Sequence, residues 1–265
     1  MNKNTIDGQG PKSNVNVTYI GGPTAIFEIG GLRLITDPTL DPAGNIYHSG
    51  TLIHEKIKGP ITTDIGKIDL VLLSHDQHYD NLDNGGRLLL QTVPKTFTTL
   101  SGAERLKGTS IGLNTWQTVS VSAPDGTVIN ITATPARHGP AGIEPLQGEV
   151  TGFLLSVEGD YPVQIYITGD TTFYDGVEEV ANRFHPQYVF LFAGAAQVRG
   201  PFNVTMGTND AMDTAIAFPN ATIIPLHYEG WKHYTQNEKD IQQSYQVLGV
   251  EQRFKILEAG VATPL

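Results

Sequence analysis

Short apolar runs separated by glycine turns fill the first part of the chain. Asn16–Ile20 alternates apolar and polar side chains, and Thr24–Ile29 and Leu32–Thr36 are rich in residues that favour strands. Gly21-Gly22-Pro23 and Gly30-Gly31 stand between these runs. Glycine turns between such runs are typical of β-hairpins, so we expect the fold to begin with a meandering antiparallel sheet.

A continuous apolar run, Ile68–Ser74, indicates a strand that is buried on both faces. Further strands are predicted at Thr96–Leu100, Thr118–Ser122, Val128–Thr134, Val150–Val157, Val163–Thr168, Tyr188–Phe192, Thr222–Leu226 and Arg253–Leu257. Helices are predicted at Asn84–Gln91, Asp175–Phe184, Thr208–Phe218 and Glu238–Leu248. Ser101 and Glu104 have capping-box spacing and predict the start of one more short helix, which Gly108 ends.

The order of these elements is similar in the two halves of the chain, because each begins with strands and later alternates strand with helix. Two β-sheets packed on each other with helices outside satisfy this order. No shift in composition divides the chain. We therefore expect a single domain over residues 1–265, of the α/β (α+β) class, with a flexible N-terminal segment at residues 1–14.

A long stretch rich in Pro and Gly, Thr39–Lys67, separates the first strands from the apolar run. Irregular segments of this length inside a compact domain are usually functional or mobile. The stretch contains His48 and His54. Neither of them follows a predicted strand, and the same is true of His185, so we expect all three to be surface or loop residues.

A histidine or an aspartate lies just past the ends of four predicted apolar strands. Reactive groups gather at such places in α/β sheets, since the loops leave the sheet together there. With the side chains that lie nearby in the first of these loops, the set is His75, Asp76, His78, Asp80, His138, Asp170 and His227. Imidazoles and carboxylates are ligands for borderline divalent ions, so this set is a candidate metal centre.

The first loop carries most of the polar groups. Two His and three Asp lie within the nine residues 75–83, directly after a buried strand. Such a concentration of buried polarity is costly unless a cation balances it. Each of these residues taken alone could be a hydrogen-bonding or turn residue. The number of His and Asp in this one loop favours a metal centre instead.

Composition limits the chemistry further. The chain of 265 residues has no Cys, which excludes thiolate zinc sites, a Cys nucleophile and disulfides. It has 17 Lys+Arg and 27 Asp+Glu, a formal charge of −10, which argues against a nucleic-acid partner. No apolar run approaches the roughly 20 residues of a membrane span, and residues 1–11 do not resemble a signal peptide, so we expect a cytoplasmic location.

The motifs resemble those of the metallo-β-lactamase fold hydrolases, in the same order and over most of the chain. The resemblance is to the ascorbate-6-phosphate-lactonase-like and phospholipase-D-like small hydrolases in particular. The matching segments are Ile35-Thr36-Asp37-Pro38, Leu73-Ser74-His75 through Asp80, Arg137-His138-Gly139, Thr168-Gly169-Asp170 and Pro225-Leu226-His227. The resemblance implies a four-layer αββα sandwich with two metals at the edge of its sheets.

One segment departs from the family pattern, which places ligands at positions i, i+2, i+4 and i+5. An insertion of one residue makes His75 and His78 the first two ligands and keeps Asp80 in its role, with Asp76 as an alternative to His75. Gln77 would stand at the second position in a register without the insertion. Asn81 takes the place of the last His in the pattern, so the second site could be weak, differently built or empty.

The resemblance also implies roles for these residues. One ion would be held by His75, His78 and His138, and the other by Asp80 and His227, with Asp170 between them. The ions would be Zn²⁺, with Mn²⁺ or Fe²⁺ as alternatives, and one or two would be bound. A metal-bound hydroxide would then attack the substrate, with Asp80 orienting it.

The segments next to these ligands carry candidates for the remaining functions. Tyr79, Tyr228 and Trp231 could line a substrate pocket, although simple packing explains them equally well. His233 is a candidate proton donor. We expect a small-molecule substrate, namely an ester, a lactone or a phosphodiester, and leave a homo-oligomer open. The alternatives are a nuclease of the same fold and a non-catalytic relative whose metal site has decayed.

Overall fold

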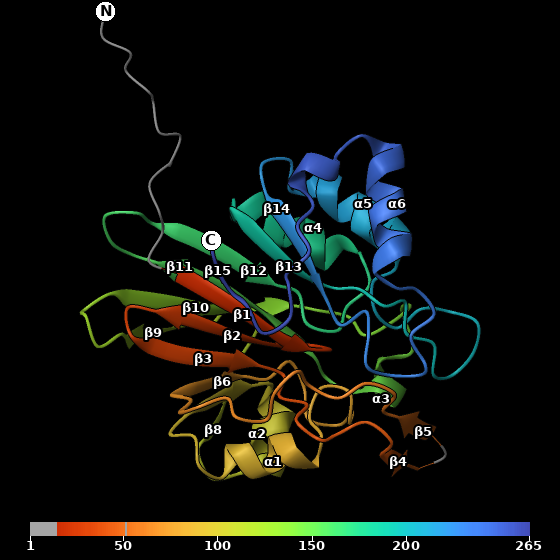
Figure 1. Cartoon of the computed structure of the whole chain (residues 1–265), viewed down its shortest axis with the longest axis horizontal. Coiled ribbons are helices and arrows are strands. Elements are labelled where there is room, and N and C mark those ends of the chain that lie inside the picture. The colour runs from red at the N-terminus through yellow and green to blue at the C-terminus, as the bar shows by residue number, and fades with distance from the viewer. Residues whose placement is uncertain (1–14, 51) are drawn as a thin grey trace, which may run out of the picture.

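The computed structural model describes residues 15–50 and 52–265. The predicted flexible segment, residues 1–14, lies outside the described residues. Two β-sheets are stacked in the middle of the molecule, and helices lie on both outer sides (Figure 1). No helix in the described ranges is long and apolar enough to cross a membrane.

The first sheet has seven strands in the spatial order β15-β1-β2-β3-β6-β7-β8. Their bounds are Val15–Gly21 (β1), Thr24–Ile29 (β2), Leu32–Thr36 (β3), Leu70–Leu72 (β6), Thr96–Thr98 (β7), Ser110–Gly112 (β8) and Ala262–Pro264 (β15). The strands β1, β2 and β3 pair antiparallel, as the glycine turns predicted. From β3 onward the pairing through β6 and β7 to β8 is parallel.

The second sheet has six strands in the order β14-β13-β12-β11-β10-β9. Their bounds are Thr118–Ser122 (β9), Val128–Pro135 (β10), Thr151–Val157 (β11), Val163–Ile167 (β12), Tyr188–Phe192 (β13) and Thr222–Leu226 (β14). The pairs from β9 to β12 are antiparallel, and β12, β13 and β14 are parallel. Strand β10 runs in the same direction as β12, because both are antiparallel to β11.

Apolar side chains from the facing sides of both sheets fill one core. The rings of Phe27 and Phe190, one from each sheet, meet edge to face with their centroids 4.8 Å apart. Leu34 and Leu155 are fully buried in the same cluster. Burial of this kind supplies most of the free energy that holds two sheets together.

Helices cover the outer face of each sheet (Figure 1). The helices α1 (Asn84–Leu90) and α2 (Leu100–Leu106) cover the first sheet, where Leu89, Leu90 and Leu106 pack against a second apolar cluster. The helices α4 (Asp175–Arg183), α5 (Thr208–Ala217) and α6 (Glu238–Leu248) cover the second sheet and bury residues such as Val177 and Ile241. The four-layer αββα sandwich is therefore confirmed.

Two predictions of local structure were wrong. The segment predicted as a last strand, Arg253–Leu257, contains the end of a 3₁₀ turn (Glu251–Arg253), and the strand that completes the sheet is β15. Helix α2 begins earlier than predicted, because Thr99 and not Ser101 caps it, accepting a hydrogen bond from the Gly102 backbone N–H at 3.0 Å.

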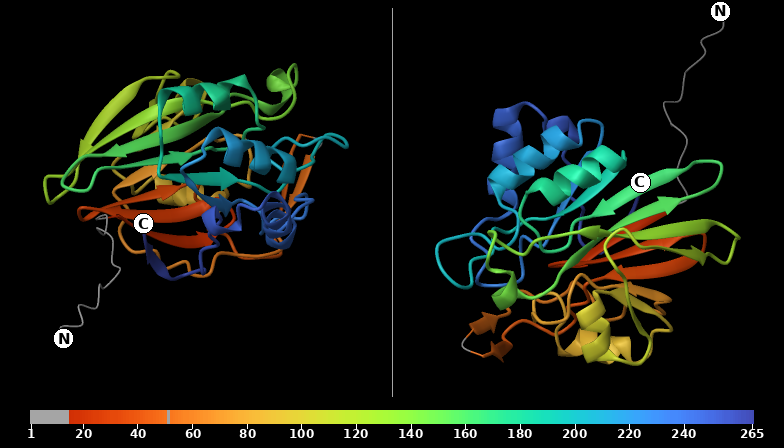
Figure 2. Two further views of the ribbon diagram at one scale, coloured as in Figure 1. Left: turned by 90° about the horizontal axis from the view of Figure 1, so that it is seen from above. Right: turned by 180° about the vertical axis from the view of Figure 1, so that it is seen from behind.

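The stretch Thr39–Lys67 is more ordered than its composition indicates. It contains an antiparallel pair of short strands, Ile46–Ser49 (β4) and Leu52–Glu55 (β5). This pair lies at one end of the sandwich, beside the one-turn helix α3 (Glu144–Gln147) (Figures 1 and 2). The prediction that His54 is a surface or loop residue was wrong, since it lies in β5 with only 1% of its surface exposed. His48 and His185 are exposed, as expected.

Candidate metal centre

Loops that follow four strands meet at one edge of the sandwich. His75 and His78 follow β6, His138 follows β10, Asp170 follows β12 and His227 follows β14. All five side chains are buried. They meet because β6 lies in the first sheet, the other three strands lie in the second, and the two sheets are stacked with these ends together.

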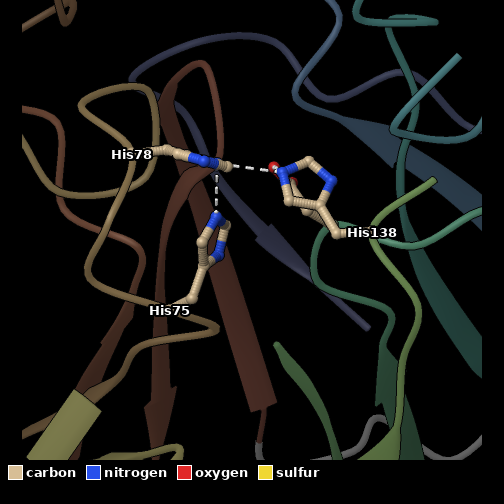
Figure 3. A group of neighbouring side chains, drawn as sticks. His75, His78 and His138 are labelled. Atoms are coloured by element: carbon tan, nitrogen blue, oxygen red, sulfur yellow. Dashed lines mark hydrogen bonds and ion pairs between the residues drawn. The ribbon is translucent and has the colours of Figure 1, made fainter. Parts of the chain in front are cut away.

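Three imidazoles form the centre of this group (Figure 3). His75 Nε2 lies 2.9 Å from His78 Nδ1, and His138 Nε2 lies 2.9 Å from the same His78 nitrogen. Asp170 Oδ2 lies 3.6 Å from His138 Nε2. The four possible ligand atoms all lie within 4.8 Å of one another, which is the spacing that a single bound cation requires.

A second group of possible ligands shares Asp170 with the first. His227 Nε2 lies 3.4 Å from Asp170 Oδ1 and 3.7 Å from Asp80 Oδ2. The ligand atoms of Asp80, Asp170 and His227 also lie within 4.8 Å of one another. Asp170 therefore stands between the two groups, which is the position that its sequence motif implied.

Two of these rings are oriented by hydrogen bonds at the ring nitrogen that faces away from the cluster. His75 Nδ1 lies 2.9 Å from Ser74 Oγ, and His138 Nδ1 lies 2.6 Å from the carbonyl oxygen of Val204. A metal-binding His commonly uses its second nitrogen in this way, because the contact fixes the tautomer and points the other nitrogen at the ion.

The chemistry of the unpaired atoms tests whether these residues fit a metal. Both carboxylate oxygens of Asp170, Oδ1 of Asp80 and Nδ1 of His227 are buried and have no hydrogen-bond partner among the described residues. Buried polar atoms without partners are costly and rare in native proteins. A divalent cation would satisfy the carboxylates, and imidazole with carboxylate is a suitable ligand set for Zn²⁺. The residues therefore fit a metal.

Burial keeps the histidines of the site neutral. It lowers the pKa of His75 and of His78 well below the ordinary value, and the neighbouring imidazoles lower it further. Burial likewise lowers the pKa of His138 to about 4 and that of His227 to about 3. Neutral imidazole is the form that binds a metal, so the site is ready to bind one at neutral pH.

The two carboxylates of the site differ in their affinity for protons. Burial and then the charges of Asp80 and Asp37 raise the pKa of Asp170 well above its ordinary value. Burial alone would raise the pKa of Asp80 as well, but His233, His54 and His227 around it hold that pKa well below its ordinary value. Asp80 is therefore ionised, and Asp170 is the carboxylate that most needs a cation.

Unusual backbone positions hold the loops in place. The Asp37 carboxylate accepts a hydrogen bond from the Ser74 backbone N–H at 2.6 Å, one residue before His75. Asp37 has φ 28° and His227 has φ 61°, a region that residues other than glycine seldom adopt. The backbone N–H of His227 donates to the carbonyl oxygen of Gly22 at 2.7 Å. Strain of this kind is common where a fold fixes a functional side chain.

The structure places the alternative ligand Asp76 outside the cluster. Its carboxylate binds the Arg105 guanidinium with both oxygens, at 2.6 Å from Nη2 and 2.9 Å from Nε. A carboxylate that is neutralised by arginine in this way has little left to offer a cation. The register with one inserted residue, which makes His75 and His78 the first pair, is the one that the geometry supports.

The predicted catalytic and substrate-binding side chains lie in different surroundings. His233 lies beside the cluster, with Nε2 2.8 Å from Asp80 Oδ2. Tyr79 is half-buried and stacks on Tyr47. Trp231 is buried, and its ring centroid lies 6.3 Å from that of His233.

Tyr228 is the exception among the predicted pocket residues. Its ring stacks on Tyr19 with the centroids 6.1 Å apart, and it belongs to the apolar core that lies between and behind the sheets. The placement of Tyr228 in a substrate pocket is thus corrected to a packing role, because its ring is buried against Tyr19 in the core.

Sequence reasoning missed two residues of the site. Tyr234 places its hydroxyl 2.8 Å from His227 Nε2 and 3.4 Å from Asp80 Oδ2. His54 places its Nδ1 3.9 Å from Asp80 Oδ1. For Tyr234 a signal was present, because it directly follows the candidate His233, whereas nothing in the local pattern distinguishes His54. The departure from the family pattern, Asn81, is fully buried beside Asp37 and Asp170.

Comparison with known proteins agrees with this geometry. Residues 33–228 match the family model of the Beta-lactamase superfamily domain. A UPF0173 metal-dependent hydrolase of Methanoregula boonei is 30% identical over 170 residues, which make up 62% of this chain and 68% of that relative.

Two solved structures share the fold over almost their whole length. One is described as a possible metal-dependent hydrolase from Veillonella parvula, with a TM-score of 0.81 and 20% identity over 96% of this chain and 100% of the other. The second is an isothiocyanate hydrolase from Delia radicum gut bacteria, with a TM-score of 0.79 and 22% identity over 94% and 99%. This chain therefore belongs to the metallo-β-lactamase fold superfamily, and it is a hydrolase.

Proposed function

We propose that this enzyme hydrolyses a small ester, lactone or phosphodiester with the help of one or two divalent cations. The observation that carries the proposal is the buried group of neutral imidazoles and carboxylates whose ligand atoms lie within 4.8 Å of one another. Among common ions this ligand set favours Zn²⁺ over Mn²⁺ or Fe²⁺. A purely structural role would leave the buried Asp170 oxygens unpaired at considerable cost.

The residues divide into two sets of ligands. His75, His78 and His138 would hold one cation, Asp80 and His227 would hold the other, and Asp170 would lie between them. A cation bound there would make water acidic enough to act as a nucleophile near neutral pH. The ionised Asp80 would accept a hydrogen bond from that water and so fix the direction of its attack.

Tyr234 and His233 act on the same side of the site as Asp80. Burial and the charges of Asp80 and Asp170 raise the pKa of Tyr234 well above its ordinary value, so its hydroxyl keeps its proton and remains a hydrogen-bond donor. Its contacts with Asp80 and His227 hold both side chains in place. His233 has 10% of its side chain exposed, and its Nε2 lies 2.8 Å from Asp80 Oδ2.

An exposed arginine, Arg199, is the candidate to bind an anionic group of the substrate. Its guanidinium donates from Nε to Gln147 Oε1 at 2.6 Å and from Nη2 to the Leu146 carbonyl oxygen at 2.7 Å, both in α3. A guanidinium binds phosphate or carboxylate groups with matched hydrogen bonds. The half-buried Tyr79 would supply apolar surface, and the buried Trp231 supports it by packing against Tyr47, on which Tyr79 stacks.

The experiment is a hydrolysis panel on the protein stripped with a chelator and then reloaded with Zn²⁺, Mn²⁺ or Fe²⁺. The panel contains a lactone, a carboxylic ester, a phosphodiester and, because of the structural neighbour, benzyl isothiocyanate. We expect turnover of one of the first three that disappears with the metal, returns on reloading and is absent from His138→Ala. The exposed His185→Ala is the matched control and should behave as the unsubstituted protein does.

Two results would contradict the proposal. Full activity in the stripped protein or in His138→Ala would reject the metal-dependent mechanism. Activity on the isothiocyanate alone would reject the substrate class and keep the metal-dependent hydrolysis.

A further inference from the structure

His54 is a buried imidazole whose two ring nitrogens have no hydrogen-bond partner among the described residues. Only 1% of its surface is exposed. An imidazole that is deprived of both water and protein partners loses hydrogen-bonding free energy at each nitrogen. The ring contacts of His54 with His78 and His233 leave both nitrogens without a hydrogen bond, so the position is suited to a ligand.

The unpaired ring faces other groups that bind cations. His54 Nδ1 lies 3.9 Å from Asp80 Oδ1, an oxygen that is itself buried and without a partner among the described residues. The ring of His233 meets that of His54 edge to face, with centroids 5.1 Å apart. The ligand atoms of His54, Asp80 and His233 all lie within 4.8 Å of one another.

The strand that carries His54 is anchored beside the loop that carries Asp80. Lys56, two residues after His54 and directly after the end of β5, places Nζ 2.7 Å from Asp83 Oδ2, with both side chains buried. Asp83 follows Asp80 by three residues. The Lys56 ammonium also donates to the carbonyl oxygen of Thr39 at 3.0 Å. These buried contacts of Lys56 hold the ring of His54 toward Asp80.

We propose that His54, Asp80 and His233 bind a divalent cation of the borderline class, such as Zn²⁺ or Co²⁺. The pair of strands β4 and β5, which belongs to neither sheet of the sandwich, then completes the metal centre. The inference rests on the proposed function and deepens it, because Asp80 is a ligand in both. In this arrangement His233 is a ligand, which replaces its predicted role as a proton donor.

The absence of cysteine from the chain makes a direct spectroscopic test possible. His54→Cys introduces the single thiol of the protein, and a thiolate bound to Co²⁺ gives a strong charge-transfer absorption in the near ultraviolet. We expect this band when the stripped His54→Cys protein is titrated with Co²⁺. The matched control is His48→Cys on the neighbouring strand β4, where the side chain is exposed, and it should give no such band.

The number of bound ions gives a second readout that does not depend on activity. In equilibrium dialysis against Co²⁺, His54→Ala should bind one ion fewer per chain than the unsubstituted protein, or bind its weakest ion at least about tenfold less tightly. His48→Ala should bind as the unsubstituted protein does. If His54→Ala loses its fold, as judged by circular dichroism in chelator, His54→Gln, which keeps the side-chain volume, takes its place.

The outcomes separate this inference from the proposed function. Unchanged Co²⁺ binding in His54→Ala together with no charge-transfer band in His54→Cys would overturn the His54 site. If His138→Ala still loses both its cation and its hydrolysis in that case, the proposed function stands. A band in His54→Cys with no hydrolysis of any panel substrate would keep the site and reject the proposed substrates.

Discussion

Lys56 Nζ lies 2.7 Å from Asp83 Oδ2, and the two side chains are 2% and 0% exposed. The same carboxylate accepts hydrogen bonds from the backbone N–H groups of Leu40, at 2.9 Å, and of Gly86, at 2.8 Å. One aspartate therefore joins the residue that follows β5, the segment after β3 and the first turn of α1. Its position, three residues after Asp80, makes it a support for the metal centre.

Removal of the buried ammonium should destabilise the protein strongly. Lys56→Met leaves the Asp83 charge buried without its cation, and we expect the free energy of unfolding to fall by about 3 kcal/mol. Urea denaturation of the metal-free protein measures this. Lys58→Met is the control, because Lys58 is 59% exposed in its pair with Glu229 and should contribute less than about 1 kcal/mol. Equal losses in the two variants would show that the buried pair has no special role.

The stability of the metal-free protein should fall as the pH drops from about 6.5 toward 4. Burial lowers the pKa of five histidines, which in the unfolded chain return to about 6.5. They are His54, His75, His78, His138 and His227. Below that value the unfolded state binds more protons than the folded state, so acid favours unfolding.

Two carboxylates oppose this trend. Burial raises the pKa of Asp37 to about 8 and that of Asp170 well above its ordinary value, so both hold protons in the fold that they lose on unfolding. Because two such groups stand against five histidines, stability should still decrease in acid. Urea midpoints between pH 7 and pH 4.5 in the presence of chelator test this. His138→Gln should show a shallower decrease, and a midpoint that rises in acid would contradict the sign.

Much of the site could be predicted because its residues follow strongly patterned strands. The run Leu70–Leu72 is wholly buried and the bounds of Thr222–Leu226 agree with the prediction, so the places of His75 and His227 followed from local pattern. What the pattern could not give is the direction of each side chain beyond the strand end. Asp76 follows His75 directly, yet it turns to Arg105, a partner that lies 29 residues away in the chain.

His54 was missed because Thr39–Lys67 was predicted to be irregular, and β5, which lies in it, reverses the usual rule of burial. Ile53 is 62% exposed, whereas its neighbours His54 and Lys56 are 1% and 2% exposed. A prediction that buries the apolar side of this strand therefore assigns the wrong side chains to the interior. The inward polar face is stable only because Asp80 and Asp83 lie opposite it, and the positions of two loops relative to each other are not contained in a local pattern.

Gly169, between β12 and Asp170, should not tolerate a side chain. Its φ is 62°, and an added Cβ would lie 2.6 Å from the Thr151 carbonyl oxygen and 3.0 Å from Ser74 Cβ. We expect Gly169→Ala to lose at least about 2 kcal/mol more of the free energy of unfolding than Gly108→Ala. Gly108 is the matched control, since its φ is 60° and nothing lies within 4 Å of its added Cβ. Similar losses would mean that backbone strain alone matters and that close packing behind Asp170 does not.

Tyr234 should affect turnover without affecting the metal content. Its hydroxyl touches His227 Nε2 and Asp80 Oδ2, but a protonated phenol is a poor ligand, so Tyr234→Phe should leave the number of bound cations unchanged. Loss of a contact that orients two ligands typically lowers activity by about 10- to 100-fold. We expect this decrease in kcat, measured on the substrate that the panel identifies, with elemental analysis of the same sample.

The control for Tyr234→Phe is Tyr245→Phe. The hydroxyl of Tyr245 donates to the Ala211 carbonyl oxygen at 2.9 Å between α6 and α5, and not to any of the proposed ligands. Its removal should cost about 1 kcal/mol of stability and leave kcat unchanged. A loss of cation from Tyr234→Phe would make the tyrosine a part of the binding site. An unchanged kcat would show that the surrounding loops hold Asp80 and His227 in place without it.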